Sequence, residues 1–438
     1  MALGQYRESV CMRRGNSVRQ NRRRFLKSVT AGGAVAFAGL SGCVGGIDDD
    51  DDDGAATDDE DADFDTVTIG LLEPFTGDFA DLAEERNNGE RLAIEHVNES
   101  DDYDFEFDPV EYDTQLNAED GVQAATEAIQ SDEAQFLTGA ISSSVALALN
   151  EVAANNEVIY TPGAADVSIT GANCNEYVFR FETSTAQIAS VMSQWMTDEG
   201  FERIHYQISD YAYGDSVLAE VDSAMADLND DYELVETTRS DQGTTDFDAA
   251  ITQIQESVGD ADAVVVGATG GHLVRFLTQA AERGLPEEIP IVTTTASFAS
   301  VRAGAAEAAY GIYSGTRYVP DLDTGNNAQF VEDYEAEYGN PPDNFSRVGY
   351  GSIMMIANGI QEAASDDPDD VKEVLPGMTH ETMLGDVEFR ECDQQATNPV
   401  WMAECVEPDE GEIAAVDLLE SFDAEEAAPP CEDTGCEL

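Results

Sequence analysis

The residues that could carry chemistry in this sequence are small or hydroxyl-bearing, and they gather where predicted strands end. Six segments have this character: 73–78 (EPFTGD), 139–144 (GAISSS), 161–166 (TPGAAD), 210–214 (DYAYG), 268–271 (ATGG) and 293–297 (TTTAS). A serine or threonine hydroxyl beside the free N–H groups of a helix start is a good seat for a carboxylate or amide oxygen. Each segment alone is better explained as a helix cap or a turn, but six in one chain favour a binding cleft.

The motifs of common enzymes do not occur in the sequence. Its four histidines, His96, His205, His272 and His380, are scattered, with no HExxH and no CxxC beside them, so we expect no metal site. There is no GxSxG nucleophile elbow and no Walker loop, and the glycine-rich turn at 267–271 lacks the second glycine of GxGxxG. We therefore expect no catalytic residues, no cofactor and no enzymatic activity.

Charge is distributed unevenly along the 438 residues. Residues 1–27 hold eight of the 20 Lys and Arg, and residues 28–42 (SVTAGGAVAFAGLSG) hold no charge. This uncharged run is shorter than the roughly 20 residues needed to span a bilayer, so 1–42 is predicted to be a signal peptide. The alternative is a basic tail before a buried helix.

Two short motifs refine the signal prediction. Residues 21–27 (NRRRFLK) resemble a twin-arginine export signal, and 40–43 (LSGC) resemble a lipoprotein cleavage box, which would make Cys43 a lipidated N-terminus. Residues 43–65 are predicted to be an acidic tether. The protein is then expected to be exported and lipid-anchored on the outer face of the cytoplasmic membrane. Export would also expose two glycosylation sequons, Asn98 (NES) and Asn344 (NFS).

The exported part of the chain is extremely acidic. It retains 12 basic and 90 acidic residues, a net charge of −78. Such self-repulsion destabilises a compact protein unless salt screens it, and at 1 M salt the Debye length is about 3 Å. The composition therefore indicates adaptation to high salt, with disorder as the competing interpretation. Nucleic acid is excluded as a partner, because phosphate recognition needs clustered Lys and Arg.

Short β-rich runs alternate with helical patterns after the tether, which is typical of an α/β protein with parallel sheets. One helix-like segment is 83–98. Residues 385–391 and 400–406 are predicted to pair as a hairpin, and the last twenty residues are predicted to be loose. The other candidate strands are 67–72, 109–114, 135–140, 157–161, 203–209, 263–268 and 289–294.

The chain between about Val67 and Val406 resembles the extracytoplasmic substrate-binding proteins of branched-chain amino acid and amide ABC importers. The segments that carry the resemblance are TIGLLEPFTGDFA, GERLAIEHVN, TGAISSSVALA, YTPGAADVSIT, YVFR, DYAYG, TTDFDAAITQI, GLPEEIPIV and GDVEFR, in this order and spacing. The resemblance implies an α/β fold of two Rossmann-like lobes with parallel sheets, joined by three crossover strands. It also implies a monomer without enzymatic activity, which closes on a small solute and delivers it to a membrane permease.

A ligand site is implied by the same resemblance. Ser143 matches the serine that grips the ligand's carboxylate or amide group, with Ser144 beside it, and Tyr213 matches an aromatic residue presented by the second lobe. A core role for Tyr213 is equally open, because buried tyrosine is common where its hydroxyl finds a partner. The remaining implied positions are the backbone of Gly163, Ala164 and Ala165, the neighbour Tyr211, and the strand-end residues Thr76, Thr269 and Thr295.

Two departures from the family pattern bear on the ligand. Amino-acid binders of this family usually carry threonine where Ala165 stands and an acid for the α-ammonium group where Thr295 stands. Losing both removes a donor and a counter-charge, which is costly for a buried zwitterion, although Asp166 could supply the charge. Branched-chain amino acids are therefore favoured only slightly over an amide, urea or a related neutral or anionic solute.

The resemblance also divides the chain into parts. The first lobe is expected from 66–182 plus 312–385, the second from 183–311 plus 386–410, and an acidic tail from 411–438. The crossovers are expected near 181–185, 310–313 and 385–390.

Export also bears on the five cysteines of the globular part. Cys392 and Cys405 flank the predicted hairpin turn, and Cys431 and Cys436 lie close together in the sequence. In an oxidising compartment we expect these two disulfides, with Cys174 free. A zinc site is less favoured, because no histidine lies near them.

Three functions from different classes fit these observations. The solute receptor of an ABC importer predicts reversible binding without turnover. A ligand-sensing module of a membrane receptor would use the same fold, and only its partner would distinguish it. A secreted α/β enzyme predicts turnover but lacks a catalytic constellation, so we rank the three in this order.

Overall fold

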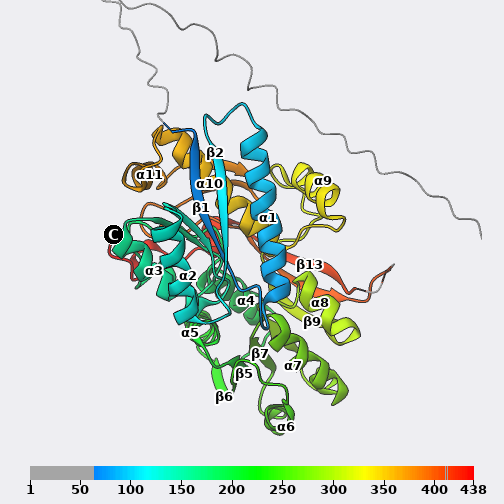
Figure 1. Ribbon diagram of the computed structural model, residues 1–438. Helices are drawn as coiled ribbons and strands as arrows, with labels where there is room; N and C mark the ends of the chain where they lie inside the picture. Colours follow the sequence, from blue (N-terminus) through cyan, green and yellow to red (C-terminus); the bar gives the residue numbers. More distant parts are fainter. Residues whose placement is uncertain (1–63, 410, 412) are drawn as a thin grey trace, which may run out of the picture. The chain divides into compact units, whose positions relative to one another are not determined.

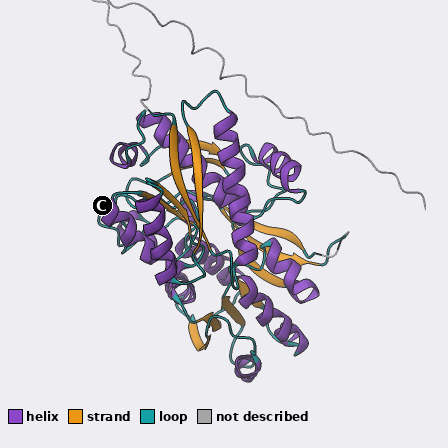
Figure 2. Cartoon of the chain, in the orientation of Figure 1, coloured by secondary structure: helices purple, strands orange, loops and turns teal. Residues whose placement is uncertain are grey.

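The computed structural model describes residues 64–409, 411 and 413–438, and all of them belong to one compact unit. The signal peptide 1–42, Cys43 and nearly all of the tether 43–65 lie outside the described residues. The described chain forms two large sheets flanked by helices (Figure 1 and Figure 2). This topology confirms the expected α/β class. None of the described helices is both long enough and apolar enough to span a membrane.

The first lobe consists of β1 (Thr66–Glu73), α1 (Ala80–Glu99), β2 (Glu106–Asp113), α2 (Ala118–Ser131), β3 (Phe136–Gly139), α3 (Ser143–Asn156), β4 (Ile159–Pro162), α9 (Asn327–Tyr338), α10 (Asn344–Ala363), α11 (Pro368–Val374), β10 (Thr379–Thr382) and β11 (Gly385–Glu388). Its main sheet is parallel, in the order β2-β1-β3-β4. In β1, Ile69, Leu71 and Leu72 are fully buried, as expected for a strand covered by helices on both faces. Helix α1 packs against α10, and α2 packs against α3.

The second lobe consists of α4 (Thr185–Asp198), β5 (Arg203–Ser209), α5 (Ala212–Leu228), β6 (Glu233–Ser240), α6 (Asp248–Ser257), β7 (Ala263–Gly267), α7 (Gly270–Glu282), β8 (Ile291–Thr293), α8 (Ala299–Ala305), β9 (Ile312–Thr316), β12 (Val400–Val406), β13 (Ala415–Phe422) and α12 (Ala424–Ala427). Its seven-stranded sheet has the order β13-β12-β9-β8-β7-β5-β6. The strands β5 to β9 pair in parallel, whereas β12 is antiparallel to both of its neighbours. A capping box between Ser184 and Gln187 starts α4.

The close contact between α1 and α10 requires glycine. A Cβ atom on Gly89 would lie 2.0 Å from the carbonyl oxygen of Ser346, and one on Gly349 would lie 2.2 Å from the carbonyl oxygen of Arg86. The side chain of Arg86 forms a fully buried ion pair with Glu73, the last residue of β1. Burial raises the pKa of Glu73 well above its ordinary value, and the Arg86 guanidinium opposes this shift. This packing fixes the end of β1 against the helices.

The chain passes between the two large sheets three times. The first passage, between β4 and α4, contains Glu182 and agrees with the crossover expected near 181–185. The second follows β9 at Arg317, and the third precedes β12 at Asn398.

The expected lobe boundaries at 312–385 and 386–410 differ from the structure. Strand β9 pairs with β8 and β12, so it belongs to the second lobe and the passage comes after it, not at 310–313. Strand β11 pairs with β10, and Val387 packs in the core of the first lobe, so the third passage lies beyond 385–390.

The hairpin of 385–391 with 400–406 does not form. Strand β11 pairs with β10, and β12 pairs with β9 and β13, so both runs find partners outside the predicted pair. The expectation that the last twenty residues are loose is also wrong, because they include the end of the edge strand β13 and helix α12, which packs against α4.

The predicted disulfide pairs are wrong as well. The structure joins Cys174 to Cys436 and Cys392 to Cys431. Cys405 lies buried in β12 and is the free thiol among the described cysteines. Burial raises the pKa of the Cys405 thiol to about 12, so it stays protonated. Because the tail folds back onto the first lobe, Cys431 and Cys436 each pair with a distant cysteine, although they lie close together in the sequence.

Candidate functional site

A small cavity lies where the carboxyl ends of strands from the two lobes face one another. Its lining comes from the residues after β3, β4, β5, β7 and β8, and from residues at the second crossover and the start of α10. Ligands of α/β sheets bind at this edge. The cavity measures about 20 Å³, room for about one water molecule. A larger solute therefore needs the lobes to separate or the lining side chains to move.

Six of the residues predicted for the site line this cavity: Gly163, Ala165, Tyr211, Tyr213, Thr269 and Thr295. Gly163 and Ala165 follow β4 of the first lobe, and the other four follow β5, β7 and β8 of the second lobe. Thr295 donates its hydroxyl to the carbonyl oxygen of Ala268 at 2.8 Å. Thr269 stands at the N-cap position of α7 but makes no capping hydrogen bond, and its buried hydroxyl has no hydrogen-bond partner. The hydroxyl of Thr269 is therefore free to bind a solute atom.

The other five predicted residues do not line the cavity; they are Ser143, Ser144, Ala164, Asp166 and Thr76. The buried Ser143 hydroxyl accepts the backbone N–H of Asp166 at 3.3 Å. The Asp166 carboxylate accepts the backbone N–H of Ser168 at 2.8 Å and also binds its hydroxyl. Thr76 is exposed and donates to Asp113 at 2.9 Å. Asp166 is thus engaged within its own turn and does not face the cavity.

Two tyrosines form the second-lobe wall of the cavity. Tyr213 donates its hydroxyl to Thr294 at 2.6 Å and accepts from Nη2 of Arg317 at 3.3 Å. Its ring centroid lies 6.1 Å from that of Tyr211. Burial raises the pKa of the Tyr211 phenol well above its ordinary value, and Tyr213 adds to the shift. The Tyr211 hydroxyl therefore stays protonated and can donate a hydrogen bond.

Four lining residues were missed by the sequence analysis: Ile141, Phe298, Arg317 and Phe345. Arg317 binds Glu182 at 2.9 Å through Nη1, and its guanidinium lies 5.3 Å from the ring centroid of Phe298. The rings of Phe298 and Phe345 meet edge-to-face, with centroids 5.4 Å apart. Arg317 directly follows β9, which was not among the strands expected from the sequence, so no local pattern pointed to this residue.

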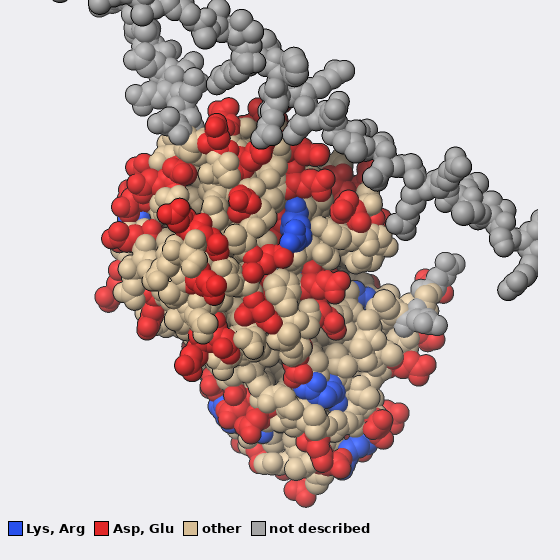
Figure 3. Space-filling model, in the orientation of Figure 1, with Lys and Arg blue, Asp and Glu red and all other residues tan. Residues whose placement is uncertain are grey.

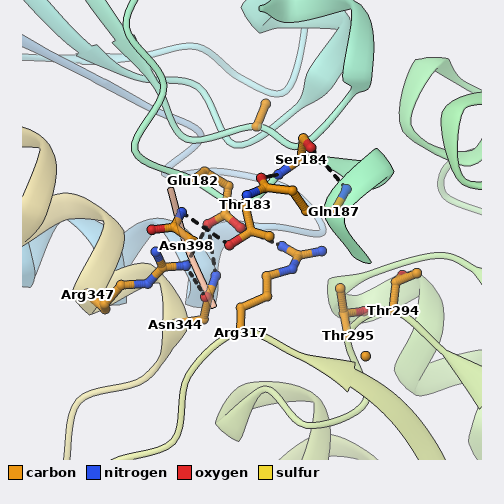
Figure 4. A network of polar contacts seen from close by, with 12 residues as sticks. Glu182, Thr183, Ser184, Gln187, Thr294, Thr295, Arg317, Asn344, Arg347 and Asn398 are labelled. Atoms are coloured by element: carbon orange, nitrogen blue, oxygen red, sulfur yellow. Dashed lines mark hydrogen bonds and ion pairs between the residues drawn. The ribbon is translucent and has the colours of Figure 1, made fainter. Parts of the chain in front are cut away.

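A buried polar network joins the three crossovers (Figure 4). Glu182 from the first crossover binds Arg317 from the second, and its other oxygen accepts Nδ2 of Asn344 at 3.0 Å. Arg347 donates to Asn344 at 2.8 Å and lies 3.7 Å from Glu182. Asn398 from the third crossover donates to the carbonyl oxygen of Phe181 at 2.7 Å. Because Asn344 is fully buried, its sequon is not accessible in the folded protein.

Polar contacts also close the lobes on each other outside the cavity. Asp78, just before α1, forms an ion pair with Arg275 of α7 at 2.6 Å, and its carbonyl oxygen accepts the N–H of Gly271 at 3.1 Å. The hydroxyl of Ser216 on α5 accepts the N–H of Val167 at 3.1 Å. These contacts belong to a closed arrangement of the lobes.

Two of the histidines, His205 and His272, are buried among packed side chains. His205 contacts the hydroxyls of Ser257 at 2.9 Å and Thr238 at 3.3 Å. Burial lowers the pKa of His272 to about 4, and the charge of Arg275 contributes. Nowhere in the described residues do three His, Cys, Asp or Glu side chains gather in a way that could hold a metal ion.

Replacing Ser143 by alanine is expected to weaken solute binding by about 1–3 kcal/mol, because the N–H of Asp166, the residue after the lining residue Ala165, would lose its buried acceptor. Ser223→Ala on the exposed face of α5 is the matched control. Calorimetric titration measures both variants. An unchanged affinity in Ser143→Ala would remove Ser143 from the site.

Comparisons with known proteins agree with this architecture. A family model described as periplasmic binding protein matches residues 66–412. The leucine-, isoleucine-, valine-, threonine-, and alanine-binding protein of Pseudomonas aeruginosa is 24% identical over 330 residues, which cover 75% of this chain and 86% of that protein.

Solved structures share the fold over nearly their whole length. An amino acid ABC transporter substrate-binding protein from Pseudomonas fluorescens Pf-5 matches with a TM-score of 0.77 at 22% identity, covering 85% of this chain and 99% of that one. An ABC transporter solute-binding protein from Rhodopseudomonas palustris BisB5, solved with 3,4-dihydroxybenzoic acid, matches with a TM-score of 0.75 at 22% identity, covering 82% and 98%. The chain therefore belongs to the periplasmic binding protein family and has the type I fold of ABC transporter substrate-binding proteins.

Proposed function

We propose that this protein is the solute receptor of an ABC importer, which captures a small organic solute between its lobes and delivers it unchanged to a membrane permease. The observation that carries the proposal is the cavity at the facing strand ends of two lobes joined by three crossovers. Membership of a solute-binding family supports it. The receptor acts as a monomer and catalyses no reaction.

Binding works through a hinge equilibrium. The open form admits the solute, and the closed form surrounds it with residues from both lobes, including Tyr213 and Ala165. The solute shifts the equilibrium only by the difference between its affinities for the two forms. The Asp78–Arg275 ion pair joins the two lobes in this arrangement, so separating the lobes at this point would break it.

The names of two similar proteins indicate two classes of solute to test. The name of the Pseudomonas aeruginosa protein gives five amino acids, leucine, isoleucine, valine, threonine and alanine. The Rhodopseudomonas palustris structure contains an aromatic acid. A carboxylate is common to both classes. A branched-chain amino acid remains the first solute to test, with amides and urea as alternatives.

The N-terminal segment supplies the membrane attachment in this proposal. Residues 1–42 direct export by the twin-arginine route, Cys43 carries the lipid, and the acidic segment 43–65 tethers the lobes to the outer face of the membrane. Mass spectrometry of the mature N-terminal peptide tests this point. An unmodified Cys43 in the membrane fraction would contradict it.

High salt is the expected working condition. Asp and Glu side chains are spread over the face seen in Figure 3, with few Lys and Arg among them. With a net charge of −78 after the signal segment, the folded state is stable only where salt screens the repulsion.

A thermal-shift screen tests the receptor function. The purified chain is screened in molar KCl against amino acids, amides, urea and organic acids, and again at low KCl without solute. We expect one class of solute to raise the unfolding temperature, since a ligand at 100 times its Kd adds about 2.7 kcal/mol of stability. Lower stability at low KCl is also expected. If no solute raises the unfolding temperature, the receptor proposal fails.

A further inference from the structure

The cavity contains no negative charge that could receive an ammonium group. Neither aspartate nor glutamate is among its lining residues. Carboxylates close to lining residues are occupied: Asp166 binds Ser168, Glu182 binds Arg317 and Asn344, and Asp343 accepts the N–H of Ala299. A buried ammonium without a counter-charge costs several kcal/mol. Binding of a zwitterionic amino acid is therefore less favourable than binding of a carboxylate that has no ammonium group.

Positive charge, in contrast, is concentrated behind the cavity. Arg180, Arg317 and Arg347 are each at most 2% exposed. Among the described residues, Glu182 is the one carboxylate that forms ion pairs with Arg317 and Arg347. Arg180 forms no ion pair in this part of the chain and binds neutral groups instead, such as Gln395 at 2.5 Å.

These arginines also act on one another. Burial lowers the pKa of Arg180 to about 10, and the charge of Arg317 lowers it further while Asp166, Asp393 and Glu182 act against this. Burial also lowers the pKa of Arg347 to about 10, and the charge of Arg317 contributes to this shift. An anion beside Arg317 would relieve this repulsion, as oppositely charged partners do for buried charges.

Two polar groups on the lining can bind such an anion. The buried Nε of Arg317 and the buried hydroxyl of Thr269 have no hydrogen-bond partner, and both can donate to a carboxylate oxygen. The rest of the lining is apolar or aromatic, with Ile141, Phe298 and Phe345. This surface suits an apolar body on the same solute.

We infer that the cavity selects a monocarboxylate with an aromatic or branched aliphatic body and no α-ammonium group, and that Arg317 is the residue that determines this choice. The inference rests on the proposed receptor function and narrows its solute class. It departs from the amino-acid preference because the charge of the site is opposite to what an ammonium group needs.

Matched solutes test the inference on the full chain in molar KCl. Calorimetry compares 4-methylpentanoate with leucine and 4-methylpentanamide, and 3-phenylpropanoate with phenylalanine and 3-phenylpropanamide. Within at least one set, we expect the carboxylate without ammonium to bind about tenfold or more tightly than its amino-acid and amide counterparts. Leucine or phenylalanine binding as tightly as its deaminated counterpart would overturn the inference and leave the receptor proposal standing. No binding by any of the six would overturn the inference, whereas the receptor proposal fails only if no solute of the wider thermal-shift screen stabilises the protein.

Variants of Arg317 test its role separately. Arg317→Gln should remove the carboxylate preference, and Arg317→Lys should keep part of it, because lysine retains the charge but not the planar donor geometry. Arg203→Gln, at the opposite end of β5, is the control and should leave the preference unchanged. If Arg317→Gln fails to fold, the comparison of matched solutes on the wild-type protein still tests which class of solute binds. A full carboxylate preference in folded Arg317→Gln would contradict the assignment of Arg317.

Discussion

Replacing Glu182 by alanine is expected to lower the free energy of unfolding by about 3–5 kcal/mol, the usual cost of removing one partner from a buried charge network. Glu182 is fully buried, and it binds Arg317 at 2.9 Å and Asn344 at 3.0 Å. Its loss would leave Arg317 and Arg347 without their shared ion-pair partner. Because the network joins all three crossovers, we expect solute binding to weaken as well.

Denaturant unfolding in molar KCl measures this effect. Glu373→Ala is a suitable control, because Glu373 is exposed on α11 and surface substitutions usually change stability by less than about 0.5 kcal/mol. A loss below about 1 kcal/mol for Glu182→Ala would contradict the view that this carboxylate holds the crossovers together.

Removing the disulfide between Cys174 and Cys436 is expected to cost about 2–5 kcal/mol. The bond spans 262 residues of sequence, whereas the bond between Cys392 and Cys431 spans 39. In the chain-entropy model, the longer loop stabilises the folded state more. The double variant Cys174→Ala/Cys436→Ala should therefore lose more stability than Cys392→Ala/Cys431→Ala.

This disulfide also has a mechanical consequence. The tail leaves the second lobe after β13, packs α12 against α4, and returns to the first lobe at Cys174. It thus adds a covalent connection between the lobes beside the three crossovers. Non-reducing peptide mapping checks which cysteines are paired, and denaturant unfolding curves measure the stability lost in each double variant. Equal stability of the two double variants and the wild type would contradict the expected stabilisation by these disulfides.

Much of the fold could be predicted from the sequence, because apolar runs in buried parallel strands are distinctive. The run VTIGLL in β1 and the run AVVVG in β7 are clear examples. Strand β9 (IYSGT) was missed because small polar residues break its apolar character. Strand β13 (AVDLLESF) was missed because an exposed edge strand in this acidic chain resembles the loose tail around it.

The candidate site was predictable only in part, for a related reason. Thr269, Thr295 and Tyr213 follow strands, and the carboxyl ends of parallel strands meet at one edge of a sheet. Arg317 and Phe345 reach the cavity through a crossover and the start of α10, and no local pattern indicates where such segments return. The disulfides were mispredicted for the same reason, since their partners meet only in the folded chain.

The measurement that tests the central claim most directly is equilibrium binding followed by recovery of the solute. The full chain in molar KCl is titrated by calorimetry with the solute that stabilises it most, and the solute is then analysed chemically after long incubation. The account predicts one solute bound per chain and its recovery unchanged. Conversion of the solute into a product, or the absence of saturable binding by any solute, would contradict it.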